Sequence, residues 1–572
     1  MRLLDLPGNG VQVIGNLIRS LRRRGLDYVV VQLEGSFPER ASRGRAPFPI
    51  RMLPLFPSEV SLEEMEAMVA LIGSDERVEG AILRLGKLRA GPPTLHTLRQ
   101  MVQRLRDEGK QTVAWVASAG TWEYYLASAC DEIIVPPSGR LNVLGLRSEA
   151  LFLKDTLSMA GVEADLESIA EYKVTPDMFR RSTMTEPHRE MVEGILDSYY
   201  EELIDGIAEG RSLERAQVRE LIDRMPLAPA DAVEAGLVDA VLYEDELARY
   251  AADGKAASED GDEGRAPLLT WDQAVRWIRR PIRWTTRKRI GVVSVEGMIV
   301  PGESRRMPTP LPLPVEAQAG AETVTRALRR AEADPRIAAV ILHVDSPGGS
   351  SLASDLIWRE VRRLGERKPV VALMGEQAAS GGYYVSAPAS RIVARPTTMT
   401  GSIGIWGGKV VLGGLYDRLK VGHKEVQRGA RADLYSEFEP FSEAEREQVR
   451  QELGAFYARF KQVVADGRGM AEEEVEEIAR GRVWTGKQAQ EVGLVDELGD
   501  FEVALAMAKE LAELDPQKRY TVVQVTAPGQ ETLPRPFPTN GDVDRLALLD
   551  GLRDLAREHV WAMAPWVVRV RG

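Results

Sequence analysis

Two glycine-rich turns in the second half of this 572-residue chain follow apolar runs and carry groups suited to attack on a carbonyl carbon. The first is Asp345-Ser-Pro-Gly-Gly-Ser350. Two glycines after a proline permit a tight turn whose amides can stabilise an oxyanion, although a plain strand-to-helix turn is the alternative. The second is Gln377-Ala-Ala-Ser-Gly-Gly-Tyr-Tyr384, where small neighbours leave the hydroxyl of Ser380 accessible.

Ser380 has two interpretations, a nucleophile or a simple N-cap of a helix that starts at Gly381. A nucleophile in a Ser-His-Asp triad needs a histidine, and none of the five occurs in a recognisable catalytic loop. The histidines are His96, His188, His343, His423 and His559. Without histidine the serine needs another base. A lysine that burial keeps neutral can supply one near pH 7.

Four motifs in order now resemble those of a known family. The two turns are followed by Thr400-Gly-Ser-Ile-Gly404 and Gly481-Arg-Val-Trp-Thr-Gly486. Together they resemble the long, tandemly duplicated form of the signal peptide peptidase A family, also called protease IV. The resemblance covers both halves of the chain. It implies domains of the crotonase and Clp-protease type and a serine endopeptidase with a Ser/Lys dyad, which needs no metal or nucleotide.

The resemblance also implies roles for individual residues. Ser380 matches the nucleophile, Lys173 the general base, and Ser402 the serine that holds the lysine amine in line. Apolar peptides, chiefly released signal peptides, are the implied substrates, and a homotetramer is the implied assembly. The implied oxyanion hole consists of the amides of Gly348, Gly349 and Gly381.

Internal similarity gives support that does not depend on the family. Segments of the first half recur in the second at an offset of 257 to 262 residues. Val31-Gln-Leu-Glu-Gly35 matches Val293-Ser-Val-Glu-Gly297, and Ala235-Gly-Leu-Val-Asp239 matches Val492-Gly-Leu-Val-Asp496. A nearly constant offset over such a length indicates tandem duplication with small insertions and deletions.

The repeat register shows reciprocal losses at the candidate site. Ser380 aligns with Thr121, and Lys173 aligns with Ala430. Each half has therefore lost what the other retains. Two intact sites would repeat the same motifs, so this pattern predicts one composite site where the two domains meet.

The duplication also sets the expected domains. Homologous domains are predicted over about 28–250 and 288–510, joined by a linker and connecting helix over 251–287. A helical region over 1–27 precedes them, and an extension over 511–572 follows. Short β-branched runs alternate with amphipathic helical stretches. This alternation predicts α/β domains with helices packed on mainly parallel sheets.

The sequence predicts no membrane-spanning helix, because no stretch reaches the roughly 18–20 continuous apolar residues required. Apolar residues over 11–21 follow a helical period and precede three arginines at 22–24. We expect this helix to pack on the protein's own core, with a membrane-surface helix as the alternative. A second helix is expected over 542–559, and an apolar tail over 561–566 is expected to dock on the body. Localisation is expected to be peripheral on a membrane or cytoplasmic.

Composition excludes several classes of function. The chain has 86 acidic and 74 basic side chains, a net charge of −12, which disfavours sequence-independent nucleic-acid binding. Its single cysteine, Cys130, excludes an internal disulfide and a thiolate metal cluster. Gly408-Lys409 is followed by Val410, which breaks the P-loop pattern. No cofactor is expected. Two other classes stay open, a crotonase-like acyl-CoA enzyme and a non-catalytic scaffold of the same fold.

Overall fold

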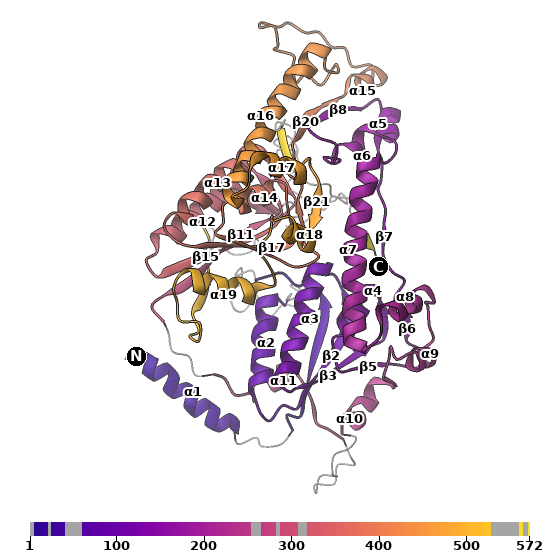
Figure 1. The fold of residues 1–572 in the computed structure, drawn as a ribbon, viewed down its shortest axis with the longest axis vertical. Coiled ribbons are helices and arrows are strands. Elements are labelled where there is room, and N and C mark those ends of the chain that lie inside the picture. The colour runs from indigo at the N-terminus through magenta and orange to yellow at the C-terminus, as the bar shows by residue number, and fades with distance from the viewer. Residues whose placement is uncertain are drawn as a thin grey trace. The chain divides into compact units, whose positions relative to one another are not determined.

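The computed structural model describes residues 5–20, 25–40, 60–252, 265–281, 286–306, 317–527, 560–563 and 570–571 (Figure 1). The chain divides into two compact units. Unit 1 comprises Met1–Arg147, Tyr199–Thr286 and Arg571–Gly572, and unit 2 comprises Ser148–Ser198 and Arg287–Val570. The helix expected over 542–559 and the middle of the expected linker, 253–264, lie outside the described residues.

Unit 1 contains a six-stranded sheet in the order β10-β1-β2-β3-β5-β9, and every neighbouring pair is parallel. Its strands are β1 (Tyr28–Gly35), β2 (Gly80–Leu88), β3 (Gln111–Val116), β5 (Glu132–Val135), β9 (Ala240–Val241) and β10 (Leu268–Thr270). A small parallel pair joins β4 (Ser118–Gly120) to β6 (Arg140–Asn142). Its helices are α1 (Asp5–Ser20), α2 (Leu62–Ser74), α3 (Pro92–Asp107), α4 (Thr121–Ala127), α8 (Arg215–Asp223), α9 (Pro229–Glu234), α10 (Leu247–Tyr250) and α11 (Trp271–Ala274).

Alternation along β1 explains how this sheet is covered. Val29 and Val31 face a core that also contains Met65 of α2 and Leu98 of α3. Tyr28 points to the opposite face, where it packs in a smaller cluster. Successive side chains of a strand point to opposite faces, so apolar residues at both parities bury both sides of the sheet.

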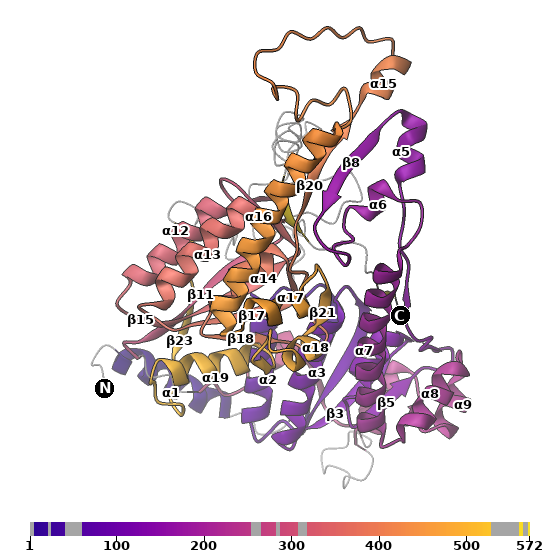
Figure 2. The same cartoon turned by 45° about the horizontal axis from the view of Figure 1, so that its top comes forward.

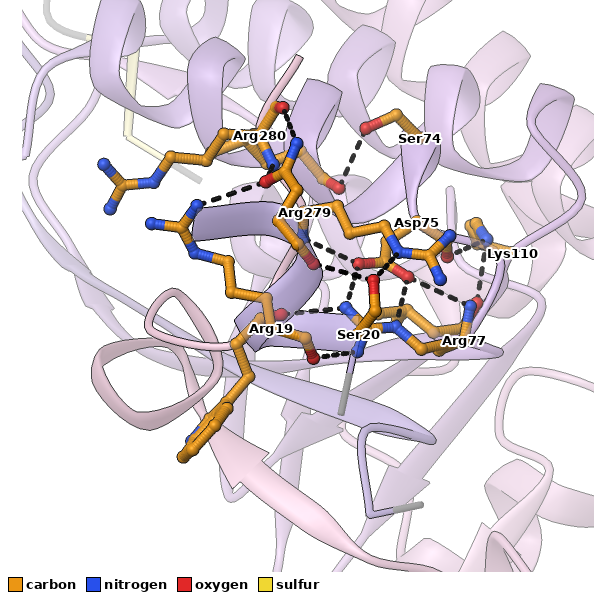
Figure 3. A network of polar contacts seen from close by, with 12 residues as sticks. Arg19, Ser20, Ser74, Asp75, Arg77, Lys110, Arg279 and Arg280 are labelled. Atoms are coloured by element: carbon orange, nitrogen blue, oxygen red, sulfur yellow. Dashed lines mark hydrogen bonds and ion pairs between the residues drawn. The ribbon is translucent and has the colours of Figure 1, made fainter. Parts of the chain in front are cut away.

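The C-terminal end of α1 is held by a polar network within unit 1 (Figure 3). Arg77 donates to the carbonyl oxygen of Arg19 at 2.8 Å and forms an ion pair with Asp75 at 2.7 Å. The amide of Arg279 donates to the same Asp75 carboxylate at 2.8 Å, and its side chain donates to Ser20 at 3.2 Å. The carboxylate accepts several hydrogen bonds, which lower its pKa despite its burial. Polar contacts, rather than apolar packing, therefore position this end of the helix.

The apolar stripe of α1 differs from the sequence expectation. The sequence predicts that it packs on the protein's core, but the members of the stripe whose side chains are described are 57% to 64% exposed. A helix attached at one end by hydrogen bonds can leave its apolar face in solvent. These residues are Ile14, Leu17 and Ile18, and the neighbouring Val13 is also exposed; the side chains of Val11 and Leu21 lie outside the described residues.

Unit 2 contains an eight-stranded sheet with the path β21-β19-β17-β15-β11-β23, and β18 and β22 extend it beside β17. Only the β19–β21 pair of this sheet is antiparallel among the described strands. The strands are β11 (Arg289–Glu296), β15 (Ile337–Ser346), β17 (Val370–Ala379), β18 (Arg391–Ala394), β19 (Met399–Gly401), β21 (Val483–Thr485), β22 (Glu497–Leu498) and β23 (Thr521–Gln524).

Helices cover both faces of this sheet (Figure 1). The larger core lies under α12, α13 and α16, and the smaller one lies under α19. The helices of unit 2 are α5 (Lys154–Ala160), α6 (Asp177–Arg180), α12 (Ala321–Ala333), α13 (Ser351–Gly365), α14 (Gly381–Ser386), α15 (Gly413–Arg418), α16 (Glu443–Arg468), α17 (Glu472–Ile478), α18 (Gly486–Glu491) and α19 (Phe501–Leu511). Helix α7 (Glu186–Arg211) spans the division between the units.

The two main sheets carry the same internal order, as duplication requires. β1-β2-β3-β5-β9 in unit 1 corresponds to β11-β15-β17-β18-β22 in unit 2. Individual contacts repeat as well. The hydroxyl of Tyr124 donates to the carbonyl of Leu237 at 2.7 Å, and that of Tyr383 donates to the carbonyl of Leu494 at 2.9 Å. The predicted α/β class with mainly parallel sheets is confirmed.

A second sheet in unit 2 has the order β13-β14-β12-β16-β24-β20-β8. Figure 2 shows β8 beside β20, and these two strands form an antiparallel ladder of six residue pairs. This ladder builds the segment 148–198, which belongs to the first sequence repeat, into unit 2. The compact units therefore divide the chain differently from the repeats. The strands are β8 (Glu163–Ser168), β12 (Met298–Val300), β13 (Arg305–Arg306), β14 (Ala317–Gly320), β16 (Gly348–Ser350), β20 (Trp406–Val411) and β24 (Val560–Met563).

Candidate active site

Ser380 occupies the sharp connection between β17 and α14 in unit 2. Its backbone has φ of 55° and ψ of −114°, a conformation that a residue with a side chain rarely adopts. The amide of Ser380 donates to the carbonyl of Gly401 at 2.7 Å, and its own carbonyl accepts from Tyr384 at 2.8 Å. Within the described residues its side chain makes no capping bond to α14. The hydroxyl is thus available for another partner.

That partner is Lys173. The Nζ atom of Lys173 lies 2.7 Å from the Oγ atom of Ser380, although the two residues are 207 positions apart in sequence. The same Nζ lies 3.0 Å from the carbonyl oxygen of Ser402 and 3.0 Å from its Oγ. Lys173 is 1% exposed, and both serines are fully buried. The structure therefore brings together three residues that the sequence analysis singled out.

The electrostatics of Lys173 favour a neutral amine. Burial lowers the pKa of Lys173 well below its usual value, because the charged form has lost its water. A neutral amine has two N–H donors and one lone pair. Three neighbouring oxygens match this inventory when the Ser402 oxygens accept and the Ser380 hydroxyl donates. In that arrangement the amine can accept the proton of the hydroxyl.

Two glycines let the Lys173 loop approach the serines. Gly481 has φ of 80°, and a Cβ built there would lie 2.5 Å from the backbone nitrogen of Lys173. A Cβ built at Gly404 would lie 3.2 Å from the Cδ atom of Lys173. Next to Gly481, the carbonyl of Arg480 accepts from the amide of Tyr172 at 3.0 Å. The Gly481–Gly486 motif thus has a definite task, since a side chain at its first position would displace the lysine.

Ser402 also has an unusual backbone, with φ of 51° directly after Gly401 at φ 74°. Its amide donates to the carbonyl of Arg482 at 2.7 Å. This turn directs both the carbonyl oxygen and the hydroxyl of Ser402 at the lysine. A residue so placed can hold the amine in line without exchanging its proton.

The glycine turn after β15 positions the candidate oxyanion amides. Gly348 has φ of 96°, and its amide donates to Oγ of Ser346 at 3.1 Å. The same hydroxyl donates to the carbonyl of Gly297 at 2.6 Å. The Gly348 amide is engaged by Ser346, and Gly349 is paired within the sheet with Ile299 of β12 and Ala562 of β24. Gly381, the first residue of α14, is the candidate of the predicted three that lies outside these pairings. Ser346 is not among the site residues predicted from the sequence.

Asp345 supports this turn from inside the unit. Its Oδ1 accepts from the amide of Gln377 at 3.1 Å, three residues before Ser380. A Cβ at Gly375 would lie 2.7 Å from the Cβ of Asp345, so the two chain segments pack closely. Burial raises the pKa of the Asp345 carboxyl. The motif that contains Asp345 was recognised in the sequence, but this brace between β15 and β17 depends on their register.

The repeat counterparts have different surroundings. Thr121, which aligns with Ser380, is fully buried and donates to the carbonyl of Gly145 at 3.1 Å. Ala430, which aligns with Lys173, is exposed. Thr121 therefore makes a structural hydrogen bond and Ala430 contacts solvent, so neither residue belongs to a second copy of the Ser380 cluster.

Comparison with protein families gives two matches on this chain. The family described as Peptidase family S49 matches residues 104–258 and residues 362–515. Two matches at this spacing confirm the predicted tandem duplication. The Ser380 turn lies within the second match and Lys173 within the first.

Curated relatives match across most of the chain. It is 31% identical over 474 residues to the protein named Serine protease SPPA, chloroplastic, of Arabidopsis thaliana. This alignment covers 83% of this chain and 69% of the relative. It is 30% identical to proteins named Protease 4 from Haemophilus influenzae and Salmonella typhi. These alignments cover 82% and 80% of this chain and 75% and 73% of the relatives.

Among solved structures, a ClpP1 mutant from Listeria monocytogenes matches 37% of this chain and 94% of its own length, with 17% sequence identity and a TM-score of 0.24.

Proposed function

This chain belongs to peptidase family S49, and we propose that it hydrolyses peptide bonds with Ser380 as nucleophile and Lys173 as general base. The family assignment makes it a serine-type peptidase and favours this activity over an acyl-CoA enzyme or a non-catalytic scaffold. The single observation that carries the dyad is the 2.7 Å contact between Nζ of Lys173 and Oγ of Ser380. Burial lowers the pKa of this lysine and so favours the neutral amine that the contact requires.

The proposed reaction has two steps. Neutral Lys173 takes the proton of Ser380 as Oγ attacks the scissile carbonyl carbon, and the amide of Gly381, with an amide of the Gly348–Gly349 turn, holds the resulting oxyanion. The lysine then gives the proton to the leaving amine, which leaves an acyl-enzyme. Water, deprotonated by the same lysine, attacks the ester, and the proton returns to Oγ as the acid product departs.

A covalent probe tests the proposed nucleophile directly. The full chain is incubated with a fluorophosphonate, which phosphonylates activated serines, and the modified peptide is located by mass spectrometry. We expect one adduct per chain, on Ser380, formed faster as pH rises. An adduct confined to another serine would reject the assignment.

The proposed substrates and assembly follow from the family and its motifs, not from the geometry of the site. Peptides are the substrate class of the family, and we propose apolar, signal-peptide-like segments because of the resemblance in the four motifs. The homotetramer implied by that resemblance also stays a prediction.

Replacement of Ser402 is predicted to weaken catalysis without abolishing it. Ser402→Ala removes one of the lysine's hydrogen bonds and leaves the other, to the carbonyl oxygen. A lost hydrogen bond of about 1–3 kcal/mol corresponds to a decrease in kcat of about 10–100-fold. Steady-state kinetics on an apolar peptide ester measure this effect.

Ser402→Gly is the matched control, because glycine relieves the backbone strain at φ 51° while it also lacks the hydroxyl. Both variants should lose activity to a similar extent. Full activity of Ser402→Gly would show that the hydroxyl has no positioning role.

We also propose that α1 attaches the protein to a membrane surface. No helix among the described residues is long and apolar enough to cross a bilayer. The exposed apolar stripe of α1 is followed in sequence by three arginines at 22–24, and the network of Figure 3 adds Arg279 and Arg280 near its end. An apolar face beside cationic residues suits an anionic lipid surface.

Sedimentation with phosphatidylglycerol vesicles tests this attachment. The double variant Ile14→Asp and Leu17→Asp should have a smaller vesicle-bound fraction than the original chain. Its partition coefficient should be lower by more than about tenfold. Each apolar side chain contributes about 1.5 kcal/mol or more on burial. Val426→Asp is the control, because Val426 is 86% exposed but lies in unit 2. Equal binding of both variants would contradict the assignment to α1.

A further inference from the structure

The loop that carries Lys173 is held by an arginine from the second repeat. The Cζ atom of Arg482 lies 5.0 Å from the ring centroid of Tyr172, the residue before Lys173. The guanidinium of Arg482 donates to Oε1 of Glu190 at 2.9 Å, and the hydroxyl of Tyr172 donates to Oε2 of the same carboxylate at 2.8 Å. The hydrogen bond from Tyr172, together with Arg482, lowers the pKa of the Glu190 carboxyl. The three side chains therefore form one closed set of contacts.

The same guanidinium also contacts a ring beside the turn of Ser402. Its Cζ atom lies 4.6 Å from the ring centroid of Trp484. A Cβ built at Gly401 would lie 2.8 Å from the Cδ1 atom of Trp484, so the ring packs on the residue before Ser402. The backbone carbonyl of Arg482 accepts from the amide of Ser402 at 2.7 Å. Arg482 thus contacts both segments that the proposed site must align, the loop of Lys173 and the turn of Ser402.

Among the described residues, charged side chains on the elements around the Lys173 loop pair with one another. These pairs are Glu171 with Arg480, Arg480 with Glu476, Glu190 with Arg482, Asp177 with Arg180 and Arg181, and Asp165 and Glu167 with Arg446. Burial is the cause of the lowered pKa of Lys173. The neutral amine consequently depends on how closely the loop is held, because water that reaches Nζ stabilises the charged form.

The first sequence repeat has the same chain path without this arginine. Trp484 forms an antiparallel pair in the β19–β21 ladder, and Leu227 forms the corresponding antiparallel bridge in unit 1. Counted from these two positions, Arg482 aligns with Met225. The fold of a repeat therefore accepts an apolar residue at this position, and the arginine is found in the repeat that contacts the lysine loop.

We propose that Arg482 is a positioning residue for the general base, and that its guanidinium joins the Lys173 loop to the turn of Ser402 so that the amine stays buried beside Ser380. Arginine suits this task because its planar guanidinium stacks on aromatic rings while its N–H groups bind a carboxylate. Without it, the loop can move enough for water to reach Nζ, which returns the pKa of Lys173 toward its usual value. This inference rests on the proposed peptidase function of Ser380 and Lys173.

The pH profile of Arg482→Met tests the proposal in the full chain. Methionine keeps an apolar side chain of similar reach but has neither the charge nor the N–H donors. We expect the midpoint of the kcat profile for an apolar peptide ester to rise by about one pH unit, which lowers kcat about tenfold below the midpoint. On the plateau the two rates should converge, and KM should change by less than about twofold. Arg482→Lys keeps the ion pair with Glu190 but not the planar stacking, so its midpoint should be intermediate.

Arg84→Met is the matched control. Arg84 also lies over a tryptophan ring, 5.6 Å from the centroid of Trp115, and pairs with Glu244 at 3.1 Å, but it belongs to unit 1. Its midpoint and kcat should equal those of the original chain. Tyr172→Leu removes a ring from the Arg482 contacts and should also raise the midpoint, so it decides the question if Arg482→Met does not fold.

An unchanged midpoint in the folded variant, with the effect confined to a lower melting temperature, would reduce Arg482 to a structural role and overturn the proposal. Absence of both hydrolysis and fluorophosphonate labelling in the original chain would instead count against the proposed function.

Discussion

Ser380→Ala is expected to lower kcat/KM for apolar peptides by at least about 10⁴-fold, since no other group can form the acyl-enzyme. Its Oγ is the atom 2.7 Å from Nζ of Lys173. Alanine keeps a Cβ at φ 55°, so the backbone strain of the turn is unchanged. Hydrolysis of a peptide ester and labelling by a fluorophosphonate should disappear together, while the melting temperature stays close to that of the original chain.

Thr121→Ala is the matched control, because Thr121 occupies the same repeat position in unit 1. It loses one buried hydrogen bond to the carbonyl of Gly145, which costs about 1 kcal/mol of stability. Its kcat/KM should change by less than about twofold. Undiminished labelling of Ser380→Ala would remove this serine from the mechanism.

Lys173→Arg should also lower kcat/KM by at least about 10⁴-fold, which makes it effectively inactive. A guanidinium keeps its proton at any pH a protein tolerates, so it cannot act as a base. It would also bring an uncompensated charge into a site where Lys173 is 1% exposed, so we expect lower stability too. Lys173→Met separates the two effects, since it is uncharged and of similar length. Substantial turnover by either variant would exclude the lysine as base.

The pH dependence provides a second measurement on the same residue. Only the deprotonated amine accepts the proton of Ser380, and burial lowers the pKa of Lys173. Activity should therefore rise with pH through this lowered pKa and reach a plateau well below the usual lysine value of about 10.4. A rate that rises only near that usual value would contradict the burial argument.

The pH dependence of the free energy of unfolding should also report the protonation of Lys173. The pKa of Lys173 is lowered in the folded chain but ordinary in the unfolded chain, so between these two values the unfolded state binds more protons. The free energy of unfolding contributed by this group consequently rises with pH across that window. Denaturant titrations should show a steeper rise for the original chain than for Lys173→Met. Parallel curves would mean that the lysine is not desolvated.

Local sequence was sufficient for several features of this protein. Strand and helix periodicities predict the α/β class, and the repeat predicts two sheets of one design. The repeated hydrogen bonds of Tyr124 and Tyr383 follow from that design. The turn residues around Ser380 and Gly348 were recognisable because positive φ angles and close packing restrict the residue types that can occur there.

Other features could be decided only by the tertiary structure, because they depend on contacts between distant segments. The contact of Lys173 with Ser380 requires the β8–β20 ladder and the glycine at position 481, and the burial that lowers the lysine's pKa arises from that packing. The stripe of α1 has the same periodicity as a buried helix face, yet it is exposed, since periodicity does not specify a partner. Likewise the apolar tail expected over 561–566 was predicted to dock on the body, but only the assembled sheet shows that its described part, within Val560–Met563, pairs with both β16 and β20.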